Sequence, residues 1–277
     1  LITVFPQLAL GGKGDVVSLG ADLTEPQRQQ MLDYFGADQK LESLRIIAVT
    51  NQEERAYLKG LVAEEVIGSK AISSAYCEIL PAGEGIQVDT RNITWVTPFM
   101  YANSLTTAGV KDAKVIAAAP FPVSGTAALT GIIRAFETAT GEKLPVHSKE
   151  VAHREMVETS ELGQKIGKDK AETIIYRVKR EVIERRVTDE DDMRELITKI
   201  ARDVGVKLEP EDIDRIIQLM TQIRGLNVSI SQLNEQLESL RGSIDQLDRT
   251  INEGRGWLER ILALIRTWIT RITALIS

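Results

Sequence analysis

The sequence lacks the residues that define several classes of protein. Cys77 is the only cysteine, so an intramolecular disulfide and the paired-cysteine spacings of redox and zinc sites are excluded. No run of about 18 or more apolar residues occurs, which excludes an ordinary transmembrane helix. Lysine and arginine total 34 against 40 aspartate and glutamate, for a net charge of −6. This balance argues against a general nucleic-acid footprint, and we expect no nucleic-acid partner.

Common catalytic and cofactor-binding motifs are also missing. The sequence has no HExxH, no glycine-rich nucleotide fingerprint, no GxSxG and no Ser-x-x-Lys. His147 and His153 flank Glu150, but their spacing points them away from each other on a helix, and the cluster is interpreted as a solvated helix start. The run Thr188–Asp192 lacks the order of a calcium loop and suits a threonine cap followed by acids at a helix N-terminus. We therefore assign no catalytic residue, no metal ligand, no cofactor and no small-molecule ligand.

The sequence does contain enough apolar residues for a core, since they make up 43% of the chain. Its length of 277 residues favours more than one structural unit. Strand and helix signals alternate in the first half, and capping-box patterns follow Thr24 and Thr50. The order strand, helix, strand, strand, helix, strand predicts an α+β, ferredoxin-like βαββαβ head, decorated by an extra strand at Val16 and flanking helices. Its predicted elements are strand 44–49, helix 50–62, strands 71–80 and 85–96 joined as a hairpin by Pro81–Gly85, helix 97–108 and strand 112–119.

The stretch AAPFPVSGTAALTG raises the question of a functional turn between that last strand and helix 126–138. Without the lysine of a phosphate loop or the setting of a nucleophile, the turn is interpreted as a joint, in which Ser124 or Thr126 caps the helix. Gly125 or Gly131 would permit close packing. Weak anion binding at the helix N-terminus is the alternative. Trp95, Phe99 and Tyr101 are expected in the core rather than in a ligand groove.

After Gly141 the strand signals stop, and helical periodicity predicts an all-helical half with helices near 150–158, 170–186 and 189–204. A final helical region begins near Pro210 and contains a heptad seam, in which isoleucine mostly occupies one position and leucine the other, as parallel two-stranded coiled coils favour. A continuous long helix or a hairpin broken at Asn252–Gly256 would both fit. The predicted self-association residues are Ile223, Leu226, Ile230, Leu233, Leu237, Leu240, Ile244, Leu247, Ile251, Leu258, Ile261, Ile265, Trp268 and Ile272.

The two ends of the chain carry their own expectations. Apolar residues alternate between Leu1 and Leu10, which suits either an edge strand or the remnant of a secretory signal. The segment Trp257–Ser277 adds apolar residues and arginines beside the seam, which suits self-association or, as the alternative, contact with a membrane surface. Four units are therefore expected: residues 1–14, an apolar extension; 15–145, the α/β head; 146–209, a helical region; and 210–277, the long heptad helix or helical hairpin.

The region from Asp15 to Gly141 resembles the YpuA-like family of predicted secreted bacterial proteins of unknown function. The residues that carry the resemblance are VVSLGADLT, VTNQEERAYL, AISSAYCEIL and the block from NITWVTPFMYANS through RAFETATG. The C-terminal half resembles the family only in being helical. The resemblance implies export, with a secreted or cell-surface location, and supplies no activity.

These observations lead us to expect a non-enzymatic secreted or cell-envelope protein, a homo-oligomer that presents the head on a helical stalk. One alternative is an extracellular filament subunit that assembles by N-terminal strand addition and C-terminal helices. The other is an enzyme of unrecognised mechanism that acts on an extracellular polymer.

Overall fold

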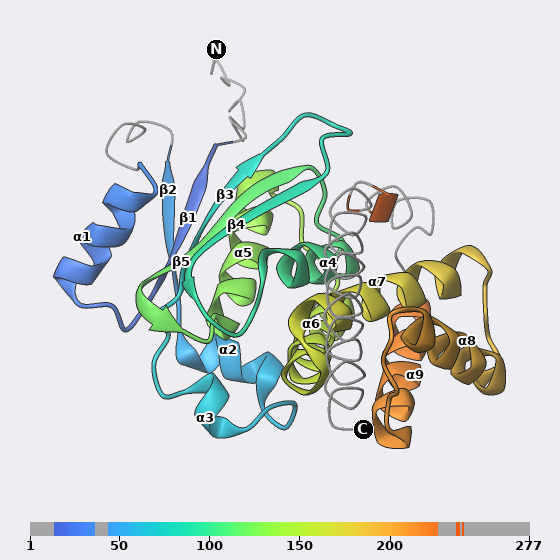
Figure 1. Ribbon diagram of the computed structural model, residues 1–277. Coiled ribbons are helices and arrows are strands. Elements are labelled where there is room, and N and C mark those ends of the chain that lie inside the picture. The colour runs from blue at the N-terminus through green and yellow to red at the C-terminus, as the bar shows by residue number, and fades with distance from the viewer. Residues whose placement is uncertain (1–13, 37–43, 227–236, 239, 241–277) are drawn as a thin grey trace, which may run out of the picture.

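A computed structural model describes residues 14–36, 44–226, 237, 238 and 240 of the chain. In these residues a five-stranded mixed sheet with helices is followed by a helical region (Figure 1), so the fold is α+β as the sequence predicts. The elements are β1 (Val16–Gly20), α1 (Glu25–Tyr34), β2 (Arg45–Val49), α2 (Asn51–Leu58), α3 (Glu64–Ile67), β3 (Ser74–Ile79), β4 (Ile86–Ile93), α4 (Pro98–Ala108), β5 (Ala113–Val123), α5 (Thr126–Thr140), α6 (Val146–Ile166), α7 (Lys168–Glu184), α8 (Glu190–Asp203) and α9 (Pro210–Arg224).

The order of the strands corrects the predicted ferredoxin-like arrangement. The sheet runs β2-β1-β3-β5-β4, in which β1 is parallel to β2 and antiparallel to β3, and β5 is antiparallel to β3 and parallel to β4. Because β5 lies between β3 and β4, the predicted hairpin through Pro81–Gly85 is wrong. The strand that begins at Val16 does not decorate the head but lies inside the sheet, between β2 and β3.

Asp112 gives the physical reason why the Pro81–Gly85 loop does not close a hairpin. Its Oδ1 accepts hydrogen bonds from the backbone N–H groups of Gly83 at 3.0 Å and Gly85 at 2.9 Å. Its backbone carbonyl accepts a third, from the N–H of Leu80 at 2.6 Å. These bonds attach the loop to the start of β5, where Ala113 pairs with β3 on one side and β4 on the other. The strand between the two arms is therefore supplied from later in the sequence, which local turn signals do not reveal.

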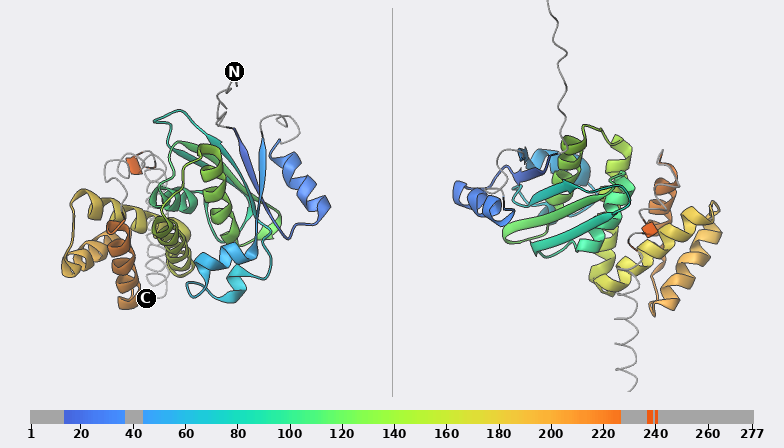
Figure 2. Two further views of the ribbon diagram at one scale, coloured as in Figure 1. Left: turned by 180° about the vertical axis from the view of Figure 1, so that it is seen from behind. Right: turned by 90° about the horizontal axis from the view of Figure 1, so that it is seen from above.

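Helices cover the two faces of the sheet unequally. The helices α4 and α5 pack on one face and α1 packs on the other (Figure 2). Val17 and Leu19 of β1 are buried with the residues of α1. On the opposite face, a Cβ atom at Gly131 of α5 would lie 2.5 Å from the Ser18 hydroxyl oxygen. Gly131 thus allows α5 to approach β1 closely, as expected from the sequence.

The local helix signals of the head are confirmed. Thr24 and Thr50 begin α1 and α2 with capping boxes, and Thr97 caps α4. Gly109 and Gly141 end α4 and α5 in the left-handed conformation that favours glycine. Trp95, Phe99 and Tyr101 are buried in the core, as predicted.

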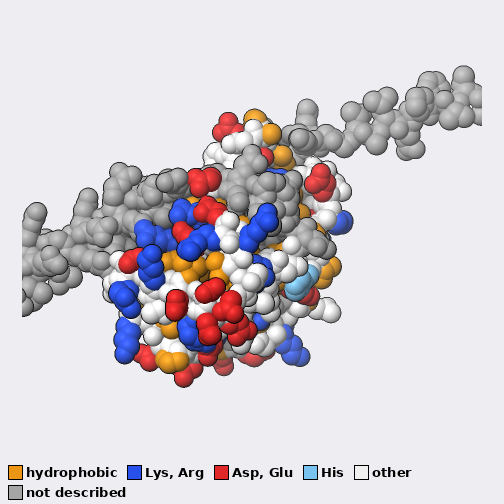
Figure 3. All heavy atoms as spheres, turned by 90° about the vertical axis from the view of Figure 1, so that its right-hand side faces the viewer, with side chains coloured by type: hydrophobic (Ala, Val, Ile, Leu, Met, Phe, Trp, Pro, Cys, Tyr) orange, Lys and Arg blue, Asp and Glu red, His pale blue; other side chains and the backbone are white. Residues whose placement is uncertain are grey.

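The helical region packs on the head through α6, which lies against α4 and α2, and through α7, which contacts α4, while α8 and α9 lie farther from the sheet (Figures 1 and 2). Acidic and basic side chains intermingle on the outer face of this region (Figure 3). At the start of α8, Asp189 accepts the N–H groups of Asp191 and Asp192. The cap is therefore Asp189 and not Thr188, although the acidic first turn is as expected.

A buried polar network joins the head to the helical region. The Lys179 ammonium of α7 lies 2.9 Å from the Glu155 carboxylate of α6, and both side chains are fully buried. Lys179 also donates to the Asn103 carbonyl of α4 at 2.8 Å, and Thr107 of α4 donates to Glu155. Because both charges are paired and hydrogen-bonded, their burial is tolerated. The network fixes the relative positions of three helices.

The first residues of the predicted seam pack inside this chain. α9 ends at Arg224, and Ile223, Leu226, Leu237 and Leu240 all belong to the hydrophobic cluster that also contains Val16 of β1. The Tyr176 hydroxyl of α7 donates to the Leu237 carbonyl at 2.8 Å. The other predicted self-association residues, the Leu1–Leu10 segment and Trp257–Ser277 lie outside the described residues.

Candidate functional site

The Ser124–Thr126 turn lies where β5 ends and α5 begins. Gly125 occupies the N-cap position of α5 with φ 97°, a left-handed conformation. A Cβ atom there would lie 2.4 Å from a methyl carbon of Ile93 and 2.5 Å from the Tyr101 hydroxyl oxygen. The Tyr101 hydroxyl donates to the Gly125 carbonyl at 2.5 Å. Both the conformation and the surrounding atoms therefore require glycine at this position.

Neither Ser124 nor Thr126 caps α5 with its side chain, which corrects the sequence-based interpretation. The Ser124 hydroxyl donates to the Val66 carbonyl at 3.0 Å, and its oxygen lies 3.2 Å from the Thr126 hydroxyl oxygen. Thr126 in turn donates to Glu54 Oε1 at 2.5 Å. The N-cap position falls on Gly125, which has no side chain, so the hydroxyls on either side bind α2 and α3 instead. The turn connects β5 to α5, as predicted, and its hydroxyl groups also bond it to α2 and α3.

Glu54 of α2 is the residue at this turn that sequence reasoning missed. Its side chain is buried, and Asn51 donates to Oε2 at 3.2 Å. Burial raises the pKa of Glu54 to about 7, against the opposing effects of the Thr126 and Asn51 hydrogen bonds and the Arg55 charge. Helical spacing could have indicated this burial, because Glu54 lies four residues before the fully buried Leu58.

The turn forms one wall of an open pocket of about 400 Å³. The Gly68–Ser73 segment before β3 also lines it. Lys70 is the cation among the lining residues, and Asp22, Glu54 and Glu65 are the acidic ones. Glu54 and Thr126 lie at this pocket together with Ser124. The Ser124 hydroxyl donates a hydrogen bond to the Val66 carbonyl, and the Glu54 carboxylate accepts from Thr126 and not from Ser124. The arrangement suits non-covalent binding more than nucleophilic chemistry, which needs a base on the attacking hydroxyl.

The histidine cluster is only partly a solvated helix start. His147 is exposed and lies 3.4 Å from the Glu150 carboxylate. His153, however, is fully buried: its ring stacks on Tyr57 at 4.4 Å, Nδ1 lies 2.7 Å from the Lys149 carbonyl and Nε2 lies 2.9 Å from the Thr130 hydroxyl. Burial lowers the pKa of His153 to about 4. The ring is therefore neutral at pH 7, and it packs α6 against α2 and α5.

No solved structure is significantly similar to this chain. It is 37% identical over 266 residues to the uncharacterized protein YpuA of Bacillus subtilis (strain 168), which covers 95% of this chain and 90% of that protein. The similarity thus extends well beyond Gly141, where the sequence-based resemblance ended. In the described part of the chain, no helix is long and apolar enough to cross a membrane, and no three acidic, histidine or cysteine side chains are grouped to hold a metal ion. Residues 19–240 match the family described as protein of unknown function DUF1002, and the chain belongs to that family.

Proposed function

We propose that the protein is a non-enzymatic secreted or cell-envelope protein that presents its α/β head on a self-associating C-terminal segment. The observation that carries the non-enzymatic part is the Ser124 hydroxyl. It donates to the Val66 carbonyl, and none of the described residues offers it a base. In this proposal, the pocket at Ser124 is a site where the head binds a ligand or partner without covalent chemistry. The resemblance to predicted secreted proteins supports the location outside the cell.

The heptad seam supports self-association. Beyond Leu240 the heptad spacing continues to Ile272. Isoleucine and leucine alternate through Ile244, Leu247 and Ile251, as a parallel two-stranded coiled coil favours, and the later members are Leu258, Ile261, Ile265, Trp268 and Ile272. Its described members, up to Leu240, are buried within the chain. We therefore assign the contact between copies to residues after Leu240.

The test is the molar mass of the purified full chain and of a chain that lacks Trp257–Ser277, measured by light scattering across a range of concentrations. We expect a small closed oligomer for the full chain and a smaller species for the truncated one, because the truncation removes the end of the seam. Equal masses for the two chains would contradict the proposal. Binding of the full chain to anionic liposomes, lost on truncation while the mass stays constant, would instead establish contact with a membrane surface.

A filament subunit is the second candidate, and β2 favours it. This strand lies at an edge of the sheet, and Ile46 on it is 40% exposed. An exposed apolar side chain does not protect an edge strand against pairing with another chain. The neighbouring Ala48 carbonyl already accepts from Arg134 at 2.7 Å, which leaves less of the edge open to an added strand. Growth of the assembly without limit, abolished by deleting Leu1–Gly11, would support the filament.

An enzyme that acts on an extracellular polymer is the weakest of the three candidates. It would need Ser124, or another hydroxyl, to be activated in a state where the bond to Val66 is broken. Covalent labelling of Ser124 by a fluorophosphonate probe would establish such a state and contradict the non-enzymatic proposal.

A further inference from the structure

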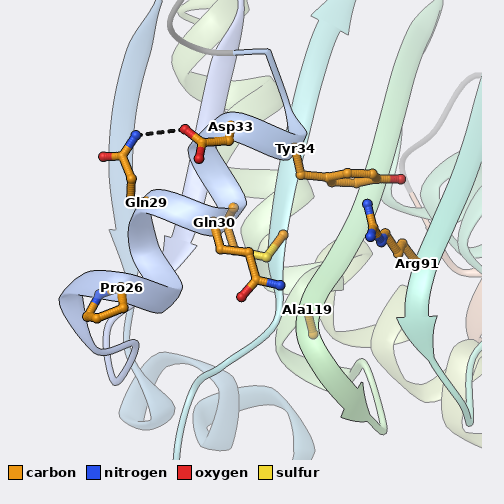
Figure 4. A pocket seen from close by; sticks show the side chains of 8 residues that line it. Pro26, Gln29, Gln30, Asp33, Tyr34, Arg91 and Ala119 are labelled. Carbon is orange, nitrogen blue, oxygen red and sulfur yellow. Dashed lines mark hydrogen bonds between the residues drawn. The ribbon is translucent and has the colours of Figure 1, made fainter.

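A second cleft, distinct from the Ser124 pocket, lies between α1 and β4. Its volume is about 590 Å³, within the usual range for ligand sites. Gln30, Asp33 and Tyr34 line it from α1 and Arg91 lines it from β4, while Met31 and Ala119 supply apolar surface (Figure 4). The cleft therefore combines one cation, one carboxylate, the two amides of Gln29 and Gln30, and an aromatic ring with an apolar floor.

Arg91 stacks on the Tyr34 ring and has no carboxylate partner among the described residues. Its guanidinium carbon lies 4.4 Å from the centre of the Tyr34 ring, which extends from the end of α1 towards it (Figure 4). Asp33 in the same cleft accepts instead from Gln29 at 2.7 Å. Stacking on an aromatic face restrains a guanidinium and leaves its N–H donors available at the edge.

The backbone next to Arg91 is unusual as well. The ladder between β4 and β5 shifts register between Arg91 and Ile93, and Asn92 between them has φ 58°. The Asn92 side chain stabilises this turn of the backbone by donating to the Ala119 carbonyl at 2.8 Å. Bulges of this kind redirect side chains and are frequent beside binding sites. Here the bulge directly follows Arg91, whose side chain stacks on the Tyr34 ring.

From this geometry we infer that the α1–β4 cleft binds a small ligand through a carboxylate, which pairs with the Arg91 guanidinium. The ligand class that fits is a short peptide with a free C-terminus. Its carboxylate accepts from Arg91, and its side chain covers Met31 and Ala119. The Gln30 amide nitrogen already donates to the Pro120 carbonyl at 3.4 Å, so Gln30 Oε1 is the acceptor for a backbone N–H of the ligand. A doubly charged phosphate fits less well, because Asp33 lies in the same cleft. The inference rests on the proposed function in treating the head as a binding unit, but it does not depend on self-association.

Saturation-transfer NMR on the full chain tests the inference with acetyl-Ala-Ala as the probe. We expect saturable binding of the acid and at least about tenfold weaker binding of the C-terminal amide, because a charge-assisted pair is lost. Arg91→Gln should weaken binding of the acid by a similar factor. Lys114→Gln, which removes an exposed cation from the same sheet face outside the cleft, should leave it unchanged.

The Tyr34 ring provides the second variant pair. Tyr34→Phe keeps the stacked ring and should retain binding, whereas Tyr34→Leu should weaken it, since the guanidinium is no longer restrained. No detectable binding of the acid, equal binding of acid and amide, insensitivity to Arg91→Gln, or stronger competition by inorganic phosphate than by acetate would each overturn the inference. Light scattering of the same samples separates these outcomes from a failure of self-association.

Discussion

At the scale of single residues, the burial of Glu54 makes the stability of the protein depend on pH. Its pKa is raised from 4.5 to about 7 in the folded state, so the folded chain keeps a proton that the unfolded chain releases. The free energy of unfolding should therefore fall as pH rises from about 4.5 to about 7, by about 1.4 kcal/mol per pH unit at most. Glu54→Gln should remove this contribution, as measured by urea denaturation at pH 5 and pH 8.

The comparison with a matched variant isolates Glu54 from the other buried titrating groups. Burial also raises the pKa of Glu172 to about 7, and the lowered pKa of His153 acts in the opposite direction, but both groups are present in every variant. Glu65→Gln removes an exposed carboxyl from the same pocket and should preserve the wild-type pH dependence. If Glu54→Gln and wild type lose the same stability between pH 5 and pH 8, the assigned role of Glu54 is wrong.

At the scale of the elements, the helices were predictable because their signals are local. Thr50 and Glu53 specify the start of α2 within four residues, and Gly141 ends α5 on its own. The strand order was not predictable in this way, since Ala113 must find partners in β3 and β4 that lie far from it in sequence. The same limit applies to the site: Ser124 and Thr126 were identified, but their partners Val66 and Glu54 are brought by other elements.

Asp112 is the residue that connects the local loop to the distant strand, and its removal provides a test at this scale. Asp112→Ala leaves the N–H groups of Gly83 and Gly85 without their acceptor and places alanine at φ 39°. We expect a loss of about 1–3 kcal/mol in the free energy of unfolding. Glu84→Ala, in the same exposed loop, should change it by less than about 0.5 kcal/mol. Equal effects of the two substitutions in chemical denaturation would show that the loop attachment contributes nothing.

At the scale of the whole molecule, one hydrophobic cluster joins the sheet to the helical region, and the Lys179–Glu155 network lies at the junction. This continuity predicts that the head and the helical region unfold together. Lys179→Met leaves Glu155 buried without its counter-charge and should cost about 3–5 kcal/mol. Lys165→Met breaks a pair with Asp212 in which the lysine is 52% exposed, and it should cost less than about 1 kcal/mol.

Hydrogen exchange of the Lys179→Met protein then decides whether the two regions are coupled. The Glu155 carboxyl contacts α4, which packs on the sheet, as well as α7, so the amides of β5 and of α7 should lose protection to the same extent. The Lys165→Met protein should keep the protection of both elements. Loss of protection confined to α7, α8 and α9, with β5 unchanged, would mean that the helical region unfolds separately, despite the continuous core.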